Sequence, residues 1–315
     1  MSSLNSETVE LPEWWLLAEK EFPQPDWERL YGWVEISFDP EARDAEFMGI
    51  ARRWVAGICE QLGDGYRVRE SEHFMLVSLV PEEKQTELLV FLEQCYVQIC
   101  AALPCLVEEQ PEGKCPVLVI ADHSRFYDYL DDFVGDGSDE YAAVGGVFLN
   151  RGWGHFAVPS SDLRQYRNVF SHELCHALLS PLRLPVWLDE AITMTVEDSV
   201  TKTNPYILDR EIIEKHQEYW DEERIQGFWT GESFCYTDDG QGLSYHLAQF
   251  VLNALYQGGS TPPGLINDFI LAAGASNDAG FQAAQDVLGF DIGELLDRLL
   301  GSGNWFPMLV PTVGD

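Results

Sequence analysis

Two histidines four residues apart, His172 and His176, are the residues best suited by type and spacing to carry chemistry. They stand in the segment His172-Glu173-Leu174-Cys175-His176, inside a stretch whose apolar spacing predicts a helix from Asp162 to Pro181. Residues four apart share one face of a helix and lie about 6 Å apart along its axis. Both imidazoles can therefore reach one ion, so the spacing predicts a two-nitrogen metal clamp.

The residues around this motif are mostly apolar, which predicts that the motif lies in the interior: Phe170, Leu174, Ala177, Leu178 and Leu179. Two imidazoles and a carboxylate are costly to remove from water unless something pairs with them. A divalent cation would offset that cost. Zinc, held by two nitrogens and one carboxylate oxygen with a fourth position open, is a common arrangement at hydrolytic centres.

A third ligand is expected from the segment Trp187-Leu188-Asp189-Glu190-Ala191, which opens the next predicted helix. The intervening loop contains two prolines and is long enough to turn the chain back. Glu190, fourteen residues past His176, is the natural candidate. Asp189 is its rival, although a carboxylate there is also favoured by the helix dipole. Glu197, seven residues further, is expected to be solvated or to support the ligands from outside.

The segments FSHELCHALLS and LPVWLDEAI resemble the gluzincin metallopeptidases, in particular the peptidase MA-like members. Their hallmark is HExxH followed by apolar-Pro-x-Trp-Leu-x-Glu and then Gly or Ala, and the flanks from about 116 to 300 are similar as well. The resemblance implies a zincin-like fold and Zn²⁺ held by His172, His176 and Glu190. It also implies that Glu173 is the catalytic base.

The same resemblance implies an oxyanion donor on a later helix. The segment SYHLAQFVLNAL is similar to the family's element, with Tyr245 as the donor and Ala248 where glycine is more usual. Tyr236 is the alternative donor. The segment from Gly145 to Val158 looks like the edge strand on which zinc peptidases bind an extended substrate, which makes Gly145 and Val147 candidate substrate-binding residues.

The elements that must position these residues follow from periodicity and breakers. The predicted fold is α+β: a small mixed sheet with helices and a mostly helical C-terminal half, with the zinc cleft between them. The predicted parts are an N-terminal extension (1–35), an α+β subdomain ending in the HExxH helix (36–180) and a helical subdomain carrying the third ligand (181–315). Helices are expected at 40–62, 81–103, 124–133, 162–181, 187–200, 206–219, 243–256, 263–273, 279–288 and 292–300; strands are expected at 66–80, 115–121, 143–149 and 155–158.

The amino-acid composition argues against some classes of binding partner. The 315 residues include 19 basic and 53 acidic side chains, a net charge of −34, which argues against binding to nucleic acid or to an anionic membrane. Neither a signal peptide nor a membrane-length apolar run is evident, so a cytoplasmic location is expected. Seven cysteines without a CxxC pair fit buried thiols rather than disulfides or a cysteine zinc site.

The predicted function is therefore zinc-dependent hydrolysis of peptide bonds in a peptide or protein substrate. One alternative is a zinc-binding pseudopeptidase that serves as a binding or regulatory module. Another is an acidic interaction scaffold in which the HExxH segment is incidental. The sequence does not indicate the oligomeric state.

Overall fold

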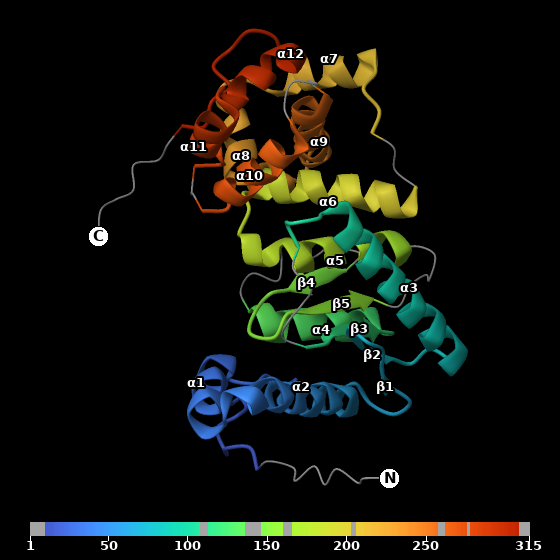
Figure 1. The fold of residues 1–315 in the computed structure, drawn as a ribbon. Coiled ribbons are helices and arrows are strands. Elements are labelled where there is room, and N and C mark those ends of the chain that lie inside the picture. The colour runs from blue at the N-terminus through green and yellow to red at the C-terminus, as the bar shows by residue number, and fades with distance from the viewer. Residues whose placement is uncertain are drawn as a thin grey trace. The chain divides into compact units, whose positions relative to one another are not determined.

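The chain divides into two units, and two of the boundaries between them fall inside helices. The computed structural model describes residues 10–107, 113–135, 146–159, 166–202, 206–257, 262–275 and 278–308. One unit comprises Met1–Tyr96 and Glu109–Glu173, and the other comprises Val97–Glu108 and Leu174–Asp315. One boundary lies within helix α3 (Glu82–Ala102) and another within helix α5 (Tyr166–Leu179). Both helices are labelled in Figure 1.

The first unit is built on a five-stranded mixed sheet with the strand order β1-β2-β3-β5-β4. β2 pairs in parallel with β3 and β3 with β5, whereas the two outer pairs, β1 with β2 and β4 with β5, are antiparallel. The small mixed sheet expected from the sequence is thus confirmed. The strands are β1 (Arg67–Glu70), β2 (Phe74–Ser78), β3 (Cys115–Ile120), β4 (Val147–Leu149) and β5 (His155–Pro159).

The strand predicted over 66–80 is wrong as a single element, because the chain folds there into the β1–β2 hairpin. The break follows Glu70, where the Ser71 N–H donates to the Phe74 carbonyl at 3.0 Å. Within this hairpin, β2 is buried throughout, whereas β1 is largely exposed. The polar run from Glu70 to His73 is the signal that separates the two strands.

One face of this sheet is covered by α1 (Trp27–Ser37), α2 (Pro40–Leu62) and α4 (His123–Val134), which share a buried core with β2, β3, β4 and β5. The predicted helix 40–62 is confirmed as α2, ending at Gly63, which has a φ of 106°. Asp122 caps α4 by accepting from the Ser124 and Arg125 amides.

Helix α1 was not expected. Its residues fall at the end of the predicted extension, where Trp27, Leu30 and Val34 are buried at helical spacing. Asp26 caps it, accepting from the Arg29 N–H. This part of the extension therefore contributes directly to the core of the first unit.

The opposite face of the sheet carries the alternate buried residues of β2, β3 and β5. Helix α3 (Glu82–Ala102) confirms the predicted helix 81–103, and its Gln85 donates to Ser78 Oγ of β2 at 3.0 Å. The first half of α5 lies close to β5 on this side. A Cβ atom on Gly146 would come within 2.6 Å of both Val158 and Val169, so only glycine fits at that position.

The second unit is helical. It contains the C-terminal end of α3 and the second half of α5. Its other helices are α6 (Val186–Thr201), α7 (Arg210–Tyr219), α8 (Ile225–Thr230), α9 (Gly240–Gln257), α10 (Pro263–Ala273), α11 (Phe281–Ala283) and α12 (Asp297–Leu300). The helix predicted at 263–273 is confirmed. In the part of the chain that the structure describes, no helix has both the length and the apolar character to cross a bilayer.

Three of the predicted C-terminal helices are shorter or less regular than expected. Residues 206–209 precede α7, because Asp209 caps that helix by accepting from the Ile212 N–H. The segment 279–288 forms α11 and then a π turn, Ala284–Leu288, that ends at Gly289 with a φ of 78°. The segment 292–300 begins as a 3₁₀ turn, Ile292–Leu295.

Two histidines outside the predicted clamp form a hydrogen-bonded chain in this unit. Trp220 Nε1–H donates to His216 Nδ1 at 3.1 Å, and His216 Nε2 lies 2.8 Å from His246 Nδ1. His246 Nε2 lies 2.8 Å from the Ile207 carbonyl, which can only accept. The acceptor at one end and the indole donor at the other fix every proton in the chain, so both rings are neutral.

Candidate metal centre

His172 and His176 lie one helical turn apart on α5, as the sequence predicts. Both side chains are partly buried. The helix stops at Leu179, where Pro181 enters a 3₁₀ turn over Ser180–Leu182. The predicted end of this helix at Pro181 is therefore confirmed to within two residues.

The turn back toward α5 depends on the backbone of the Pro181–Pro185 loop. Arg183 adopts a left-handed conformation with a φ of 52° and so reverses the chain direction. Pro185 precedes α6, and its carbonyl accepts from the Leu188 and Asp189 amides at 2.9 and 3.0 Å. Helix α6 thus confirms the helix predicted from 187 to 200.

The rotation of α6 about its axis is set by its first turn. Trp187 and Leu188 are completely buried. The Trp187 indole N–H donates to the Ala279 carbonyl at 2.9 Å, and its ring packs against Phe228 and Trp229. With these residues held in the core of the second unit, the next residues of the turn, Asp189 and Glu190, face the imidazole of His176.

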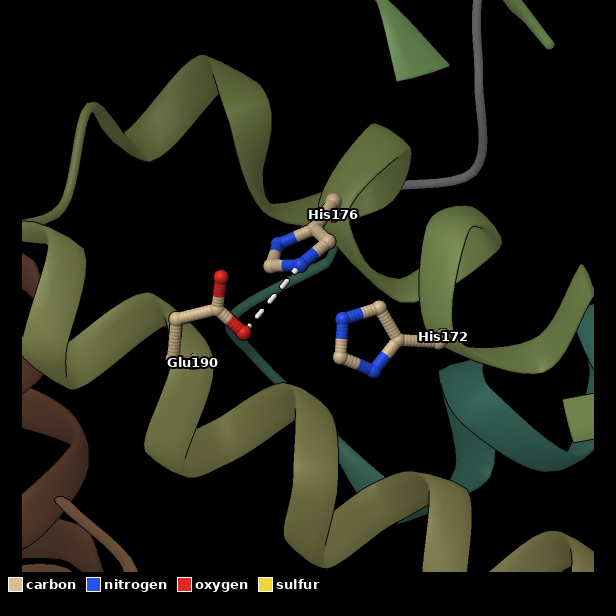
Figure 2. A group of neighbouring side chains, drawn as sticks. All are labelled: His172, His176 and Glu190. Atoms are coloured by element: carbon tan, nitrogen blue, oxygen red, sulfur yellow. Dashed lines mark ion pairs between the residues drawn. The ribbon is translucent and has the colours of Figure 1, made fainter. Parts of the chain in front are cut away.

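His172, His176 and Glu190 come together as one group. Each offers one ligand atom, and these atoms all lie within 4.8 Å of one another. Figure 2 shows the two imidazoles projecting from one helix toward the carboxylate on the next. His176 Nε2 and Glu190 Oε2 are 3.5 Å apart, and the two side chains are 17% and 14% exposed.

Asp189, the rival ligand in the sequence, contacts the other side of the same ring. Its Oδ2 lies 3.0 Å from His176 Nδ1, and Thr193 Oγ1 lies 3.4 Å from that nitrogen. A carboxylate on Nδ1 holds the proton there and leaves Nε2 to face Glu190. Asp189 is therefore a partner of a ligand candidate and does not belong to the three-residue group.

The charge state of His176 follows from these two carboxylates. Burial by itself lowers the pKa of His176, but hydrogen bonds and charge attraction from Asp189 and Glu190 outweigh it and raise the pKa well above its usual value. A cation that binds at Nε2 has to displace a proton, so its binding releases protons to the solvent.

Glu173, the predicted base, is held by the sheet of the first unit. Its Oε2 accepts a hydrogen bond of 2.7 Å from the backbone N–H of Phe148 on β4. Sequence reasoning missed Phe148, because nothing in its side chain indicates that its amide faces the motif. The only available signal was its place in the predicted edge strand.

The two candidate oxyanion donors have described contacts within the second unit. The ring of Tyr245 on α9 packs edge-to-face on Phe234, with ring centroids 5.2 Å apart. The hydroxyl of Tyr236 lies against Gly227 of α8, so close that a Cβ there would come within 2.5 Å of it. These contacts do not test either assignment, and both stay predictions.

The remaining site candidates are placed as follows. Gly145 lies outside the described residues, and Val147 is the first residue of β4, where it is buried. Glu197 is buried on α6, so of its two expected roles the solvated one is wrong, and support of the ligands stays a prediction. It is not one of the three grouped residues.

No family model matches the sequence, and no curated protein is significantly similar to it. The arrangement of the site therefore stands on its own geometry and donor chemistry.

Proposed function

We propose that this protein is a zinc-dependent peptide hydrolase. The observation that carries the proposal is the convergence of two imidazole nitrogens and one carboxylate oxygen within 4.8 Å of one another. This donor set is typical of hydrolytic zinc sites that keep one position open.

One distance within the group matches the spacing of two ligands on such an ion. Two ligands about 2.1 Å from one zinc ion and at a tetrahedral angle lie about 3.4 Å apart. The measured separation of His176 Nε2 and Glu190 Oε2 is 3.5 Å. His172, His176 and Glu190 would hold the ion, and Asp189 would orient His176 from its other nitrogen.

When bound, zinc would supply a Lewis acid that polarises a carbonyl group and makes water easier to deprotonate. Glu173 is adjacent to the first ligand and is not one of the three, and its carboxylate would take a proton from the attacking water. The same carboxylate would then pass the proton to the departing amine. Tyr245 is the proposed donor to the developing oxyanion, with Tyr236 as the alternative.

The substrate class proposed is an extended peptide that lies along the outer edge of β4, where the Phe148 N–H is already bonded to Glu173. β4 is the last strand in the sheet order, so one of its edges is not paired with any described strand. The net charge of −34 favours peptides with basic residues, because the surrounding field attracts cationic chains.

The test combines metal analysis with turnover. Protein purified without chelator is expected to contain close to one zinc per chain and to cleave members of a peptide library. Glu173→Gln should keep the zinc and lose at least about a hundredfold in kcat, the usual contribution of a general base. A chain without zinc would contradict the proposal. A chain with zinc in which Glu173→Gln changes no turnover would also contradict it.

The same variant separates the hydrolase from a zinc-binding module. A module that acts only by binding would keep both its metal and its partner when Glu173 becomes Gln. Detection of zinc without cleavage of any library peptide would favour that alternative.

A further inference from the structure

Strand β4 is one of the two outer strands of the sheet, and the backbone groups of its middle residue point away from the neighbouring strand. Its three residues pair with β5 in the register Val147↔Ala157, Phe148↔Phe156 and Leu149↔His155. In an antiparallel pair, successive residues direct their backbone groups alternately toward the partner and away from it. The Phe148 N–H is bonded to Glu173, so Phe148 is the residue turned away from β5. By the same alternation, Val147 and Leu149 direct their backbone groups toward β5.

This alternation determines which residue of β4 offers backbone hydrogen-bonding groups at the outer edge of the sheet. Val147 is the residue suggested by sequence, but its N–H and C=O are directed into the sheet. Phe148 presents both its N–H and its carbonyl outward. Among the three residues of β4, it therefore carries the outward backbone donor, and that donor is already bound to the Glu173 carboxylate at 2.7 Å.

Packing between α5 and the sheet holds the Glu173 carboxylate at a fixed distance from strand β4. Gly146 precedes β4, and a Cβ there would come within 2.6 Å of Val158 on β5 and of Val169 on α5. Val169 lies one helical turn before Glu173. The close approach of α5 to this corner of the sheet thus brings the Glu173 side chain within reach of the Phe148 amide.

We propose that Phe148 is a positioning residue, whose backbone N–H fixes the orientation of the Glu173 carboxylate by holding Oε2. In the proposed function, Oε1 would then be the oxygen that transfers the proton. The catalytic part of this inference rests on the proposed function, but the positioning contact itself does not. A hydrogen bond from a backbone amide to a charged carboxylate is strong enough to select one rotamer of a glutamate.

The contact can be tested without metal or turnover by measuring hydrogen exchange at the Phe148 amide. Glu173→Gln keeps an oxygen that can accept from this amide, whereas Glu173→Ala removes it. Exchange at Phe148 is expected to be at least about tenfold faster in the alanine variant than in the wild-type protein or the glutamine variant. Equal exchange rates in the three proteins would overturn the proposal.

The effect on catalysis is tested by comparing Phe148→Pro with Phe148→Ala. Both variants lose the same ring, which packs on Phe156 with centroids 5.2 Å apart, and both keep the carbonyl of residue 148. Only the proline lacks the N–H, and an edge strand accepts proline where the N–H points outward. Relative to the alanine variant, the proline variant should show a kcat at least about tenfold lower with an unchanged KM and unchanged zinc content.

The outcomes distinguish this proposal from the proposed function. An equal kcat in the proline and alanine variants, when both are folded and loaded with zinc, would overturn the positioning role. If the wild-type protein cleaves no peptide, the hydrolase proposal fails, and the exchange measurement still decides whether Phe148 holds Glu173. If the proline variant does not fold, the two Glu173 variants decide the question by themselves.

Discussion

Asp189 and Glu190 are consecutive residues near the start of α6, and their carboxylates face opposite nitrogens of the His176 ring. Asp189 Oδ2 is 3.0 Å from Nδ1, and Glu190 Oε2 is 3.5 Å from Nε2. The ring is therefore held between two carboxylates of the following helix. Only the nitrogen that faces Glu190 belongs to the candidate metal site.

This division predicts that Asp189 supports metal binding without being a ligand. Asp189→Asn should lower zinc affinity by about 10- to 100-fold, the usual cost of losing a carboxylate partner of a histidine ligand. The matched control is Asp198→Asn, the same change farther along α6, which should leave the affinity unaltered. Affinity is measured by competition with a coloured chelator. Equal affinities for the two variants would show that the Nδ1 contact does not orient the ring.

Loss of Glu190 should have a larger effect than loss of Asp189, because it removes a ligand. Glu190→Gln is expected to lower zinc occupancy further and to change the absorption spectrum of the cobalt-substituted protein, since the donor set itself changes. Glu218→Gln, at an exposed position of α7 outside the group, should leave the cobalt spectrum as it is. Identical spectra for the wild-type protein and Glu190→Gln would assign the third ligand to another residue.

Because His155 is buried, we expect the folded protein to lose stability in mild acid. It is fully buried, with Nε2 2.6 Å from the Tyr129 hydroxyl and Nδ1 3.0 Å from the Trp153 carbonyl. Burial lowers the pKa of His155 to about 4, despite the carbonyl contact, which raises it. Between that value and the ordinary pKa of about 6.5, the unfolded chain binds a proton that the folded chain does not. Stability therefore falls as the pH is lowered through this window.

From pH 7 to pH 5 this single residue should reduce the free energy of unfolding by about 2 kcal/mol. Urea unfolding of the wild-type protein and of His155→Gln, each at both pH values, measures the difference. The glutamine variant should lose less stability over this interval, even if it is less stable at pH 7. His216 contributes with the same sign, because burial lowers the pKa of His216 to about 3. A pH dependence identical in both proteins would contradict the assignment to His155.

At Gly146 the edge of the sheet packs so closely against α5 that we expect a larger side chain there to destabilise the protein. Gly146→Ala should lower the free energy of unfolding by about 1–3 kcal/mol, because its Cβ would lie within 2.6 Å of Val158 and Val169. The control is Gly264→Ala in α10, where a Cβ has no neighbour within 4 Å. That variant should be neutral or slightly more stable, since alanine favours helix. Both values come from denaturant unfolding, and equal destabilisation would mean that the corner is loosely packed.

The parts of the site that were predictable from the sequence are those encoded by local spacing. His172 and His176 share a helix face because they are four residues apart, and two prolines indicate the turn that follows. The sequence favoured Glu190 over Asp189, but spacing alone could not separate them, because both lie in one helical turn. The choice depends on how far α6 is rotated, and the burial of Trp187 and Leu188 sets that rotation.

Other features depend on contacts between residues far apart in the chain. The bond from Phe148 to Glu173 is made by a backbone amide, and the residue type does not reveal where an amide points. The pairing of His216 with His246 joins α7 to α9 across 30 residues. The β1–β2 hairpin and α1 carried local signals, a polar break and an aspartate cap, that were less evident than the surrounding apolar pattern.

The bond between the Trp187 indole and the Ala279 carbonyl spans 92 residues of sequence. It anchors the turn of α6 that carries Glu190 to a segment close to α11. A truncation before residue 279 would remove this hydrogen bond, and the position of Glu190 would then be less well fixed. Zinc retention would thus report on the integrity of the C-terminal region as well as on the three residues that would contact the ion.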